Sequence, residues 1–196
     1  GLTETASFAP PVTSLLKRAR EQWPNVEFNL LQARSDDLLA ALVERRIDVA
    51  FMRSPAPNLA ALQWRSFLSE GFFVAVPSGH VLAAEPAIAL EALKREALIL
   101  PRGRTGDATM RAKIALAFAN VGVAPRIVQE TPEYIMAINL VAAGFGVSLV
   151  PTVLGGLRQG EVVYRPLVST PPLSTEIIVV TRQEDLSPVA TNFLAL

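Results

Sequence analysis

Small hydroxyl residues stand where several predicted helices begin, and their type and position suit anion binding. A helix start offers free N–H groups and the positive end of the helix dipole, which is worth roughly 0.3–1 kcal/mol to an anion at an exposed site. Plain helix capping explains any one such residue, so a binding site is indicated only if several converge. The candidates are Thr3, Thr5 and Ser7 before the first long helix, then Ser35, Thr105 and Thr131 before later helices.

Arginine residues follow predicted strands at matching places. The segment RIDVAFMRSP brings Arg53 to the carboxyl end of an apolar strand, and Arg34 and Arg102 stand at equivalent strand ends. Ligands of open parallel sheets bind at this edge, and a guanidinium is a good fork for a carboxylate. A structural pair of Arg53 with an acid or a carbonyl is an equal alternative. Phe145 is a candidate to close over an apolar ligand, with ordinary packing as its alternative.

Enzyme chemistry has little support in the sequence. The one histidine, His80, stands in the polar turn PSGH and is expected to be a solvent-exposed loop residue. No HExxH motif or Asp-rich loop is present, and ILPRGRTGD lacks the GK[ST] of a phosphate-binding loop. The glycines around Phe145 follow a helix and precede a strand, which reverses the dinucleotide-binding context. We therefore expect no catalytic residue, no metal and no cofactor.

Composition narrows the class of protein further. The 196 residues include 18 basic and 18 acidic side chains, so the formal net charge is zero and a DNA-binding surface is not expected on this chain. Hydrophobic residues make up 51%, yet no stretch of 18 uninterrupted apolar residues predicts a membrane span. The chain has no cysteine, which excludes disulfides and thiolate metal sites. Both ends read like cuts through a longer polypeptide, and the opening GLTETASFAPP has no signal-peptide character.

Helices and strands are predicted to alternate, as in α/β folds with crossover helices. No linker separates two lobes, so we expect the strands at 71–77 and 175–182 to carry the chain between them. Further strands are expected at 26–31, 47–52, 97–100, 126–129, 147–151 and 161–167, and helices at 12–23, 36–46, 89–95, 107–120, 132–143 and from Ser187-Pro188 onward.

Several segments together resemble the effector-binding domain of LysR-type transcriptional regulators, across essentially the whole chain. NLVAAGFGVSLVP is the most specific of them, and Val81 stands where the family usually has proline. The others are RIDVAFMRSP, AVPSGHVLA, EALILPR and VAPRIVQET.

This resemblance implies a fold like that of type 2 periplasmic binding proteins, with two Rossmann-like subdomains joined by two crossover strands. It implies subdomain I at 1–73 plus 178–196, subdomain II at 74–177, and a small effector, expected to be a carboxylate, in the cleft between them. Thr5 and Ser35 match effector contacts of the first subdomain, and Arg102, Thr105, Gly106, Glu130 and Thr131 match those of the second.

The resemblance also implies partners. A helix-turn-helix head, absent from this chain, reads DNA in the family, whose members are cytoplasmic and assemble as dimers or tetramers. The helices at 12–23 and 107–120 match the dimer surface, with Trp23 and Leu116 as candidates for burial there. A periplasmic solute-binding protein of a transport system is the alternative.

Overall fold

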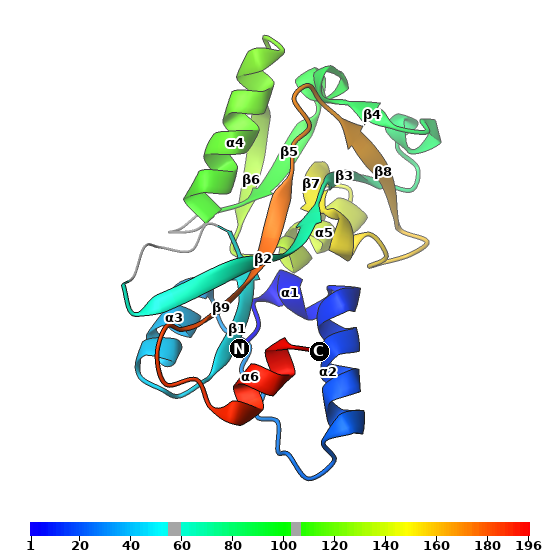
Figure 1. Cartoon of the computed structure of the whole chain (residues 1–196). Helices are drawn as coiled ribbons and strands as arrows, with labels where there is room; N and C mark the ends of the chain where they lie inside the picture. The colour runs from blue at the N-terminus through cyan, green and yellow to red at the C-terminus, as the bar shows by residue number, and fades with distance from the viewer. Residues whose placement is uncertain (55–59, 103–106) are drawn as a thin grey trace. The chain divides into compact units, whose positions relative to one another are not determined.

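The computed structural model describes residues 1–54, 60–102 and 107–196, except for the side chains of 107–109. The chain divides into two compact units (Figure 1). Unit 1 comprises Gly1–Ser69 and Glu176–Leu196, and unit 2 comprises Glu70–Thr175. The chain therefore passes from one unit to the other twice, and the α/β architecture expected from the sequence is confirmed.

Unit 1 contains a three-stranded sheet in the order β1-β9-β2, in which the last strand of the chain is central. β9 (Thr175–Arg182) pairs antiparallel with β1 (Val49–Arg53), with Phe51 opposite Val179. The other strand is β2 (Leu62–Glu70), for which the sequence had predicted no strand. The helices are α1 (Glu4–Ser7), α2 (Pro10–Gln22), α3 (Ser35–Val43) and α6 (Pro188–Leu194).

The predicted strand at 26–31 is wrong, because this segment forms no regular strand. Among the described residues, the parallel bridge nearest to this segment joins Gln32, just after it, to Leu2, which also bridges Phe51 on its other side. Because only Leu2 is paired in this way, its bridges do not extend into the ladder of hydrogen bonds that a strand requires. The parallel sheet expected for unit 1 is thus reduced to these bridges, and the named strands β1 and β9 run antiparallel.

Helix α3 covers one face of the unit 1 sheet. Leu38 and Leu42 of α3 are fully buried against alternate residues of the two paired strands. Those strand residues are Ala50, Met52, Ile178 and Val180. The opposite face carries Phe51, whose ring lies 5.0 Å from that of Phe67 and 6.4 Å from that of Phe193 in α6.

Unit 2 is built on a six-stranded sheet in the order β4-β8-β3-β7-β5-β6. Three neighbouring strands run parallel, namely β7 (Val147–Pro151), β5 (Ala97–Pro101) and β6 (Arg126–Thr131). β3 (Phe72–Pro77) is antiparallel to both β7 and β8 (Val162–Val168), and β4 (Ile88–Ala89) is parallel to β8. The helical elements are α4 (Asp107–Asn120), α5 (Tyr134–Ala142) and the 3-10 turns η1 (Val81–Ala84), η2 (Leu90–Arg95) and η3 (Thr152–Leu154).

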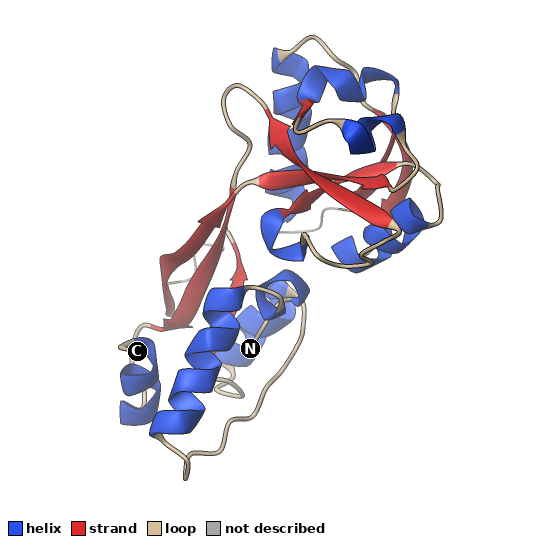
Figure 2. Ribbon diagram, turned by 90° about the vertical axis from the view of Figure 1, so that its right-hand side faces the viewer, coloured by secondary structure: helices blue, strands red, loops and turns tan. Residues whose placement is uncertain are grey.

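Helices lie on both faces of the unit 2 sheet (Figure 2). Leu98 and Leu100 pack with α4 and η2 on one face, whereas Ile99 packs with α5 on the other. A strand buried on both faces reads as a continuous apolar run, which is why the sequence predicted β5 and β7 correctly. Gly146 permits the turn into β7, because a Cβ atom there would lie 2.1 Å from the Ala97 carbonyl oxygen.

Candidate functional site

Three segments of unit 1 run parallel and end at one edge. Leu2 bridges both Gln32 and Phe51 in the parallel sense, so the residues that follow each of them lie along the same side of the unit. The residues after Leu2 lead into α1, those after Gln32 lead into α3, and those after Phe51 end β1. The edge therefore brings together Thr3, Thr5, Arg34, Ser35 and Arg53, which are all sequence-predicted candidates.

The first group at this edge is α1, a single turn that packs against β1. Thr5 and Ser7 precede the long helix α2 as predicted, but they lie inside the short helix α1, which was not predicted. Ser7 donates its hydroxyl hydrogen to the carbonyl oxygen of Glu4 at 2.6 Å, so local backbone contact accounts for that residue. Thr5 is 5% exposed.

Arg53 is the last residue of β1, opposite Ile177 of β9, and it is only 6% exposed. A charged group so deeply buried is stable only among polar partners, and a guanidinium presents five N–H donors. Loss of the Arg53 guanidinium would therefore remove both a positive charge and hydrogen-bond donors from this hydroxyl-lined edge.

Arg34 and Ser35 begin α3, but not as predicted. Arg34 occupies the N-cap position without a side-chain capping bond, and Ser35 is the first helical residue. The predicted capping role of Ser35 is therefore wrong. Both side chains are half-buried, and the hydroxyl of Ser35 belongs to the first turn of α3 at the shared edge.

The corresponding edge of unit 2 is formed by the carboxyl ends of β5 and β6. Pro101 pairs with Thr131, and the backbone N–H of Arg102 donates to the Thr131 carbonyl oxygen at 2.6 Å. Glu130 lies beside them and binds two guanidiniums. Its Oε1 is 2.5 Å from Arg111 Nη1, and its Oε2 is 3.3 Å from Arg102 Nε. The prediction that Arg102, Glu130 and Thr131 lie together agrees with this geometry.

The two guanidiniums hold the pKa of Glu130 below its ordinary value of 4.5. The hydrogen bond and then the charge of Arg111 are the main causes, with smaller contributions from Arg102. Arg111, from α4, was missed by sequence reasoning, which assigned that helix to a subunit surface. The one available signal was its position in the sequence. Arg111 lies four residues after Asp107, where α4 begins, and α4 follows the end of a strand.

Thr131 is 1% exposed and ends β6. It was predicted to cap the next helix, but α5 begins at Tyr134 with Glu133 as its N-cap. The hydroxyl of Thr131 instead donates to the Glu133 carbonyl oxygen at 3.0 Å, which leaves its oxygen lone pairs for another donor.

Phe145 does not lie with these residues. It is 62% exposed and precedes Val147, which pairs with Leu98 near the start of β5. It therefore stands at the amino edge of the parallel strands, opposite Arg102 and Thr131. Thr105 and Gly106 lie outside the described residues.

The described residues contain no group of three or more His, Cys, Asp or Glu side chains that could hold a metal ion. His80 is half-buried and not the exposed loop residue that was predicted. Its Nδ1 accepts the backbone N–H of Leu82 at 3.2 Å, and its Nε2 lies 3.3 Å from Glu96 Oε2. Within residues 1–54, 60–102 and 107–196, no helix is long and apolar enough to cross a membrane.

Comparison with known proteins decides the family. The family model described as "LysR substrate binding domain" matches residues 1–196. This chain belongs to the LysR substrate-binding domain family.

Curated relatives of the LysR domain are transcriptional regulators. The domain is 32% identical over 169 residues to the HTH-type regulator TtuA of Agrobacterium vitis, covering 86% of this chain and 54% of that protein. It is 33% identical over 183 residues to the uncharacterized HTH-type regulator YybE of Bacillus subtilis, covering 93% and 61%. The chain thus spans little more than half of these relatives. Their names favour a regulator over the transport-protein alternative.

Solved structures confirm the fold. The effector-binding domain of BenM with its effector benzoate superposes with a TM-score of 0.84 at 26% identity, covering 98% of this chain and 86% of that one. Full-length CbnR in complex with target DNA superposes with a TM-score of 0.84 at 20% identity, covering 99% and 64%, and shows the fold alone. The expected two-subdomain fold, similar to periplasmic binding proteins, is thereby confirmed.

Proposed function

We propose that this LysR domain senses a small organic acid through the carboxyl-edge residues of its units, and thereby controls DNA binding by the full-length regulator. The observation that carries the proposal is the gathering of hydroxyl and guanidinium groups at one carboxyl edge in each unit. Ligands of open α/β sheets bind at such edges. BenM, whose effector-binding domain is similar, binds benzoate as its effector.

In unit 1, the proposed contacts are the buried Thr5 hydroxyl, the start of α3 at Ser35 and the Arg53 guanidinium. Arg53 supplies the charge that distinguishes an acid from its neutral analogue, and the hydroxyls supply directed hydrogen bonds. Ser7 has a lesser role because its hydroxyl already bonds to Glu4.

In unit 2, the proposed contacts are Arg102, Glu130, Thr131 and the loop that includes Thr105 and Gly106. Glu130 holds Arg102 and Arg111 in place while neutralising part of their charge. Phe145 is left out of the proposed site because it stands at the other edge of the parallel strands.

Binding would act through differential affinity, since an effector shifts an equilibrium only toward the arrangement that it binds more tightly. In this proposal the domain binds and does not catalyse, the protein works in the cytoplasm, and an N-terminal helix-turn-helix reads DNA. Homodimers or tetramers form through α2 and α4. Leu116 of α4, which is 62% exposed, suits such a contact.

A thermal-shift series with benzoate, benzamide and aliphatic acids tests the proposal. A ligand at 100 times its dissociation constant stabilises the folded state by about 2.7 kcal/mol. We expect acids to raise the melting temperature and benzamide to raise it less. A domain that responds to no acid, or equally to benzamide, would contradict the proposal.

A further inference from the structure

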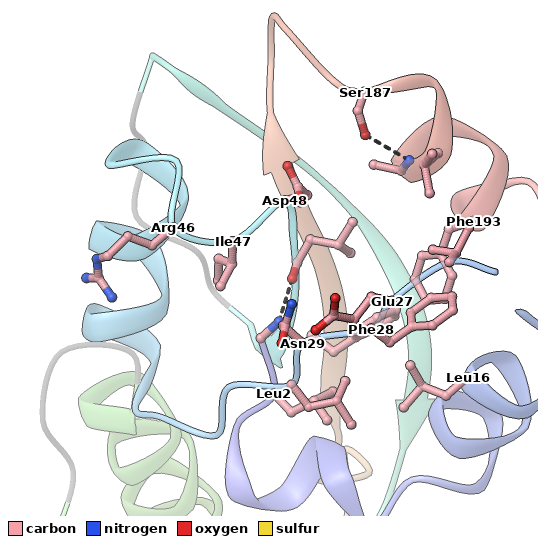
Figure 3. Close-up of a pocket in the computed structure, with 17 residues that line it drawn as sticks. Leu2, Leu16, Glu27, Phe28, Asn29, Arg46, Ile47, Asp48, Ser187 and Phe193 are labelled. Atoms are coloured by element: carbon pink, nitrogen blue, oxygen red, sulfur yellow. Dashed lines mark hydrogen bonds between the residues drawn. The ribbon is translucent and has the colours of Figure 1, made fainter. Parts of the chain in front are cut away.

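A subsite for an acid needs N–H donors that are not already used and a net positive charge. The hollow of about 260 Å³ in unit 1 does not meet these requirements (Figure 3). Its charged side chains are those of Glu27, Asp48 and Arg46, so acids outnumber bases. Arg46 is also paired already, because its Nε lies 2.7 Å from Glu44 Oε2. We therefore expect no acid to bind in this hollow.

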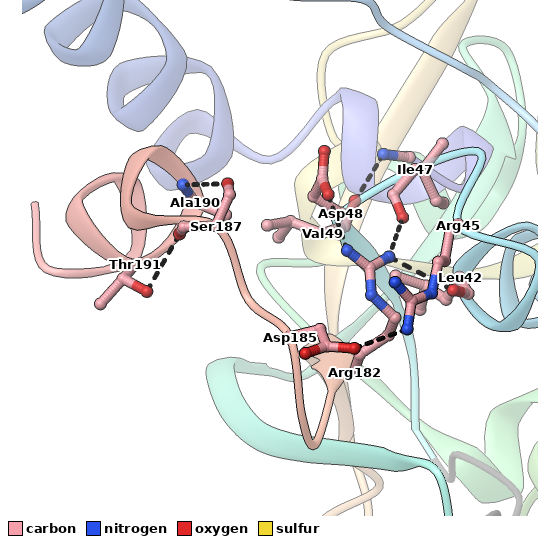
Figure 4. Close-up of polar contacts among 11 residues, drawn as sticks. Leu42, Arg45, Ile47, Asp48, Val49, Arg182, Asp185, Ser187, Ala190 and Thr191 are labelled. Atoms are coloured by element: carbon pink, nitrogen blue, oxygen red, sulfur yellow. Dashed lines mark hydrogen bonds and ion pairs between the residues drawn. The ribbon is translucent and has the colours of Figure 1, made fainter.

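Two arginines of unit 1 are committed to structural contacts (Figure 4). Arg45 Nη2 lies 2.5 Å from Asp185 Oδ2, which gives a neutral pair. Arg182 is 11% exposed and donates to the carbonyl oxygen of Ile47 at 2.7 Å and to Asp48 Oδ1 at 2.8 Å. These contacts fix the segment between α3 and β1, and they leave no excess charge for a ligand.

The ion pair of Arg158 in unit 2 is also saturated. Its Nε and Nη2 both donate to the carboxylate of Glu161, with Nε at 2.8 Å, and its Nη1 donates to Asn139 Oδ1 at 3.3 Å. All three guanidinium nitrogens are thereby engaged, and one acid balances one base. This pair is a useful reference, because it has the residue types of the Glu130 contacts in the same unit.

The cluster of Glu130, Arg111 and Arg102 is built differently, and we call it the shared-acid cluster. Glu130 accepts one bond from Arg111 Nη1 at 2.5 Å and one from Arg102 Nε at 3.3 Å. Among the residues that the structure describes, neither guanidinium has another hydrogen-bond partner. A guanidinium carries five N–H donors, so most donors of both arginines are unused. Two bases share one acid, which leaves one net positive charge.

The backbone that carries the shared-acid cluster is fixed by strand pairing and by the core. Arg102 follows β5, and its N–H donates to the carbonyl oxygen of Thr131 in β6 at 2.6 Å. Glu130 precedes Thr131 in the same strand. Arg111 follows Met110, which is 7% exposed in the core between α4 and the sheet. The side chains of both arginines are partly exposed, so a solute can reach their unused donors.

We propose that Arg111 and Arg102 form an anion subsite in unit 2, where a carboxylate of the effector competes with Glu130 for the two guanidiniums. The inference rests on the proposed function, in which unit 1 offers Arg53 to one acid group. Because unit 2 offers a second set of donors, the preferred effectors are di-acids, which carry two carboxylates. Arg111 thereby becomes an effector contact alongside Arg102.

Glu130 has two opposing effects in this subsite. It holds the two guanidiniums beside one another, and its own charge repels a second carboxylate. The balance still favours an acid, because one positive charge remains after Glu130 is counted. Exposed charge pairs contribute little, so the second carboxylate of a di-acid should raise affinity by about threefold to fivefold.

Pairs of acids with equal chain length test the proposal. The di-acids are succinate, glutarate and adipate, and their mono-acid partners are butyrate, valerate and hexanoate. Calorimetry at low salt should show at least one di-acid binding about threefold to fivefold more tightly than its partner. That di-acid should also move the Nε–H NMR signals of Arg111 and Arg102 more than its partner does. The affinity advantage should disappear in Arg111→Gln and grow in Glu130→Gln.

Arg158→Gln is the matched control. It removes an arginine of the same unit whose guanidinium nitrogens are all engaged by Glu161 and Asn139. The advantage of the di-acid should therefore be unchanged in this variant. An equal loss in Arg158→Gln and Arg111→Gln would indicate a general charge effect and would overturn the subsite.

The remaining outcomes separate this inference from the proposed function. If benzoate binds but no di-acid binds more tightly than its partner, the proposed function stands and the subsite is refuted. A di-acid advantage that survives Arg111→Gln would place the second carboxylate elsewhere, which also refutes the subsite. If no acid binds at all, the proposed function fails and this inference fails with it.

Discussion

The carboxyl edges of the two units use the same residue types in different surroundings. In unit 1, Thr5 and Arg53 are 5% and 6% exposed. In unit 2, the side chain of Arg102 is 71% exposed and that of Glu130 is 36% exposed. The charged groups of unit 2 are paired with one another at the surface, whereas the unit 1 residues are enclosed.

Because of this difference, we expect the two edges to contribute unequally to the binding free energy of a ligand. A buried donor that loses its acceptor forfeits its full desolvation free energy, whereas an exposed ion pair typically contributes at most about 1 kcal/mol and is screened by salt. We therefore expect unit 1 to determine affinity and unit 2 to tune it.

The largest effect is expected at Arg53. Changing Arg53→Met should weaken benzoate binding by about 2–5 kcal/mol, because a buried charge pair with the carboxylate is lost. Benzamide binding should change much less. Arg53→Lys keeps the positive charge but loses the planar guanidinium, so its benzoate affinity should lie between those of the native chain and of Arg53→Met. Calorimetry showing the same loss for benzoate and benzamide would remove the ionic role of Arg53.

Thr5→Val should lower benzoate affinity by about 1–2 kcal/mol, the scale of a hydrogen bond to a charged group. The substitution nearly preserves side-chain volume, so melting temperature should change little. Ser7→Ala is the matched control, because the Ser7 hydroxyl is already bonded to Glu4. Calorimetric losses of equal size in both variants would remove the distinction between the two hydroxyls.

In unit 2, Glu130→Gln should tighten benzoate binding about twofold to fivefold, because the charge that Glu130 places beside Arg102 and Arg111 is removed. Repeating the titration in about 1 M salt, where the Debye length is about 3 Å, should erase most of the gain. A gain that persists in high salt would show that this edge is as enclosed as that of unit 1.

The smallest effect concerns pH. Because Arg111 and Arg102 lower the pKa of Glu130, the stabilisation from these pairs is present above pH 4.5 and is lost as the pH falls through the lowered value. Carboxyl NMR titration should give a pKa below 4.5 in the native chain and a value nearer 4.5 in Arg111→Gln. Arg102→Gln should shift it less. Identical titrations in all three proteins would contradict the pairing.

The sequence predicted elements best where both faces are buried. β5 is apolar throughout and β9 has a central apolar run at 177–180, so their existence and type were evident. β2 was missed because it lies at the sheet edge and its residues 63–66 are all exposed, which removes the alternating pattern. For 26–31 the apolar residues suggested a strand, but a strand also requires a hydrogen-bonded partner along its length.

The same limit applies to the site. Arg102 follows β5 and Thr131 ends the neighbouring parallel strand β6, so their proximity could be inferred from chain order alone. Arg111 could not be, because its contact with Glu130 depends on how α4 turns across the sheet. Phe145 was placed with the wrong edge of the sheet. Its glycine turn leads into β7 at the amino edge of the parallel strands, whereas Arg102 and Thr131 lie at the carboxyl edge.

The central position of β9 in the unit 1 sheet also determines the order in which the two units can fold during synthesis. Unit 2 emerges from the ribosomal exit tunnel before β9 does, so unit 2 can finish its own sheet while β1 still lacks its antiparallel neighbour. A nascent chain stalled with residues up to 174 outside the tunnel would carry one closed unit and one open one. Pulse proteolysis of that stalled chain should cut β1 and β2 first, and full resistance should appear only once the last strand emerges.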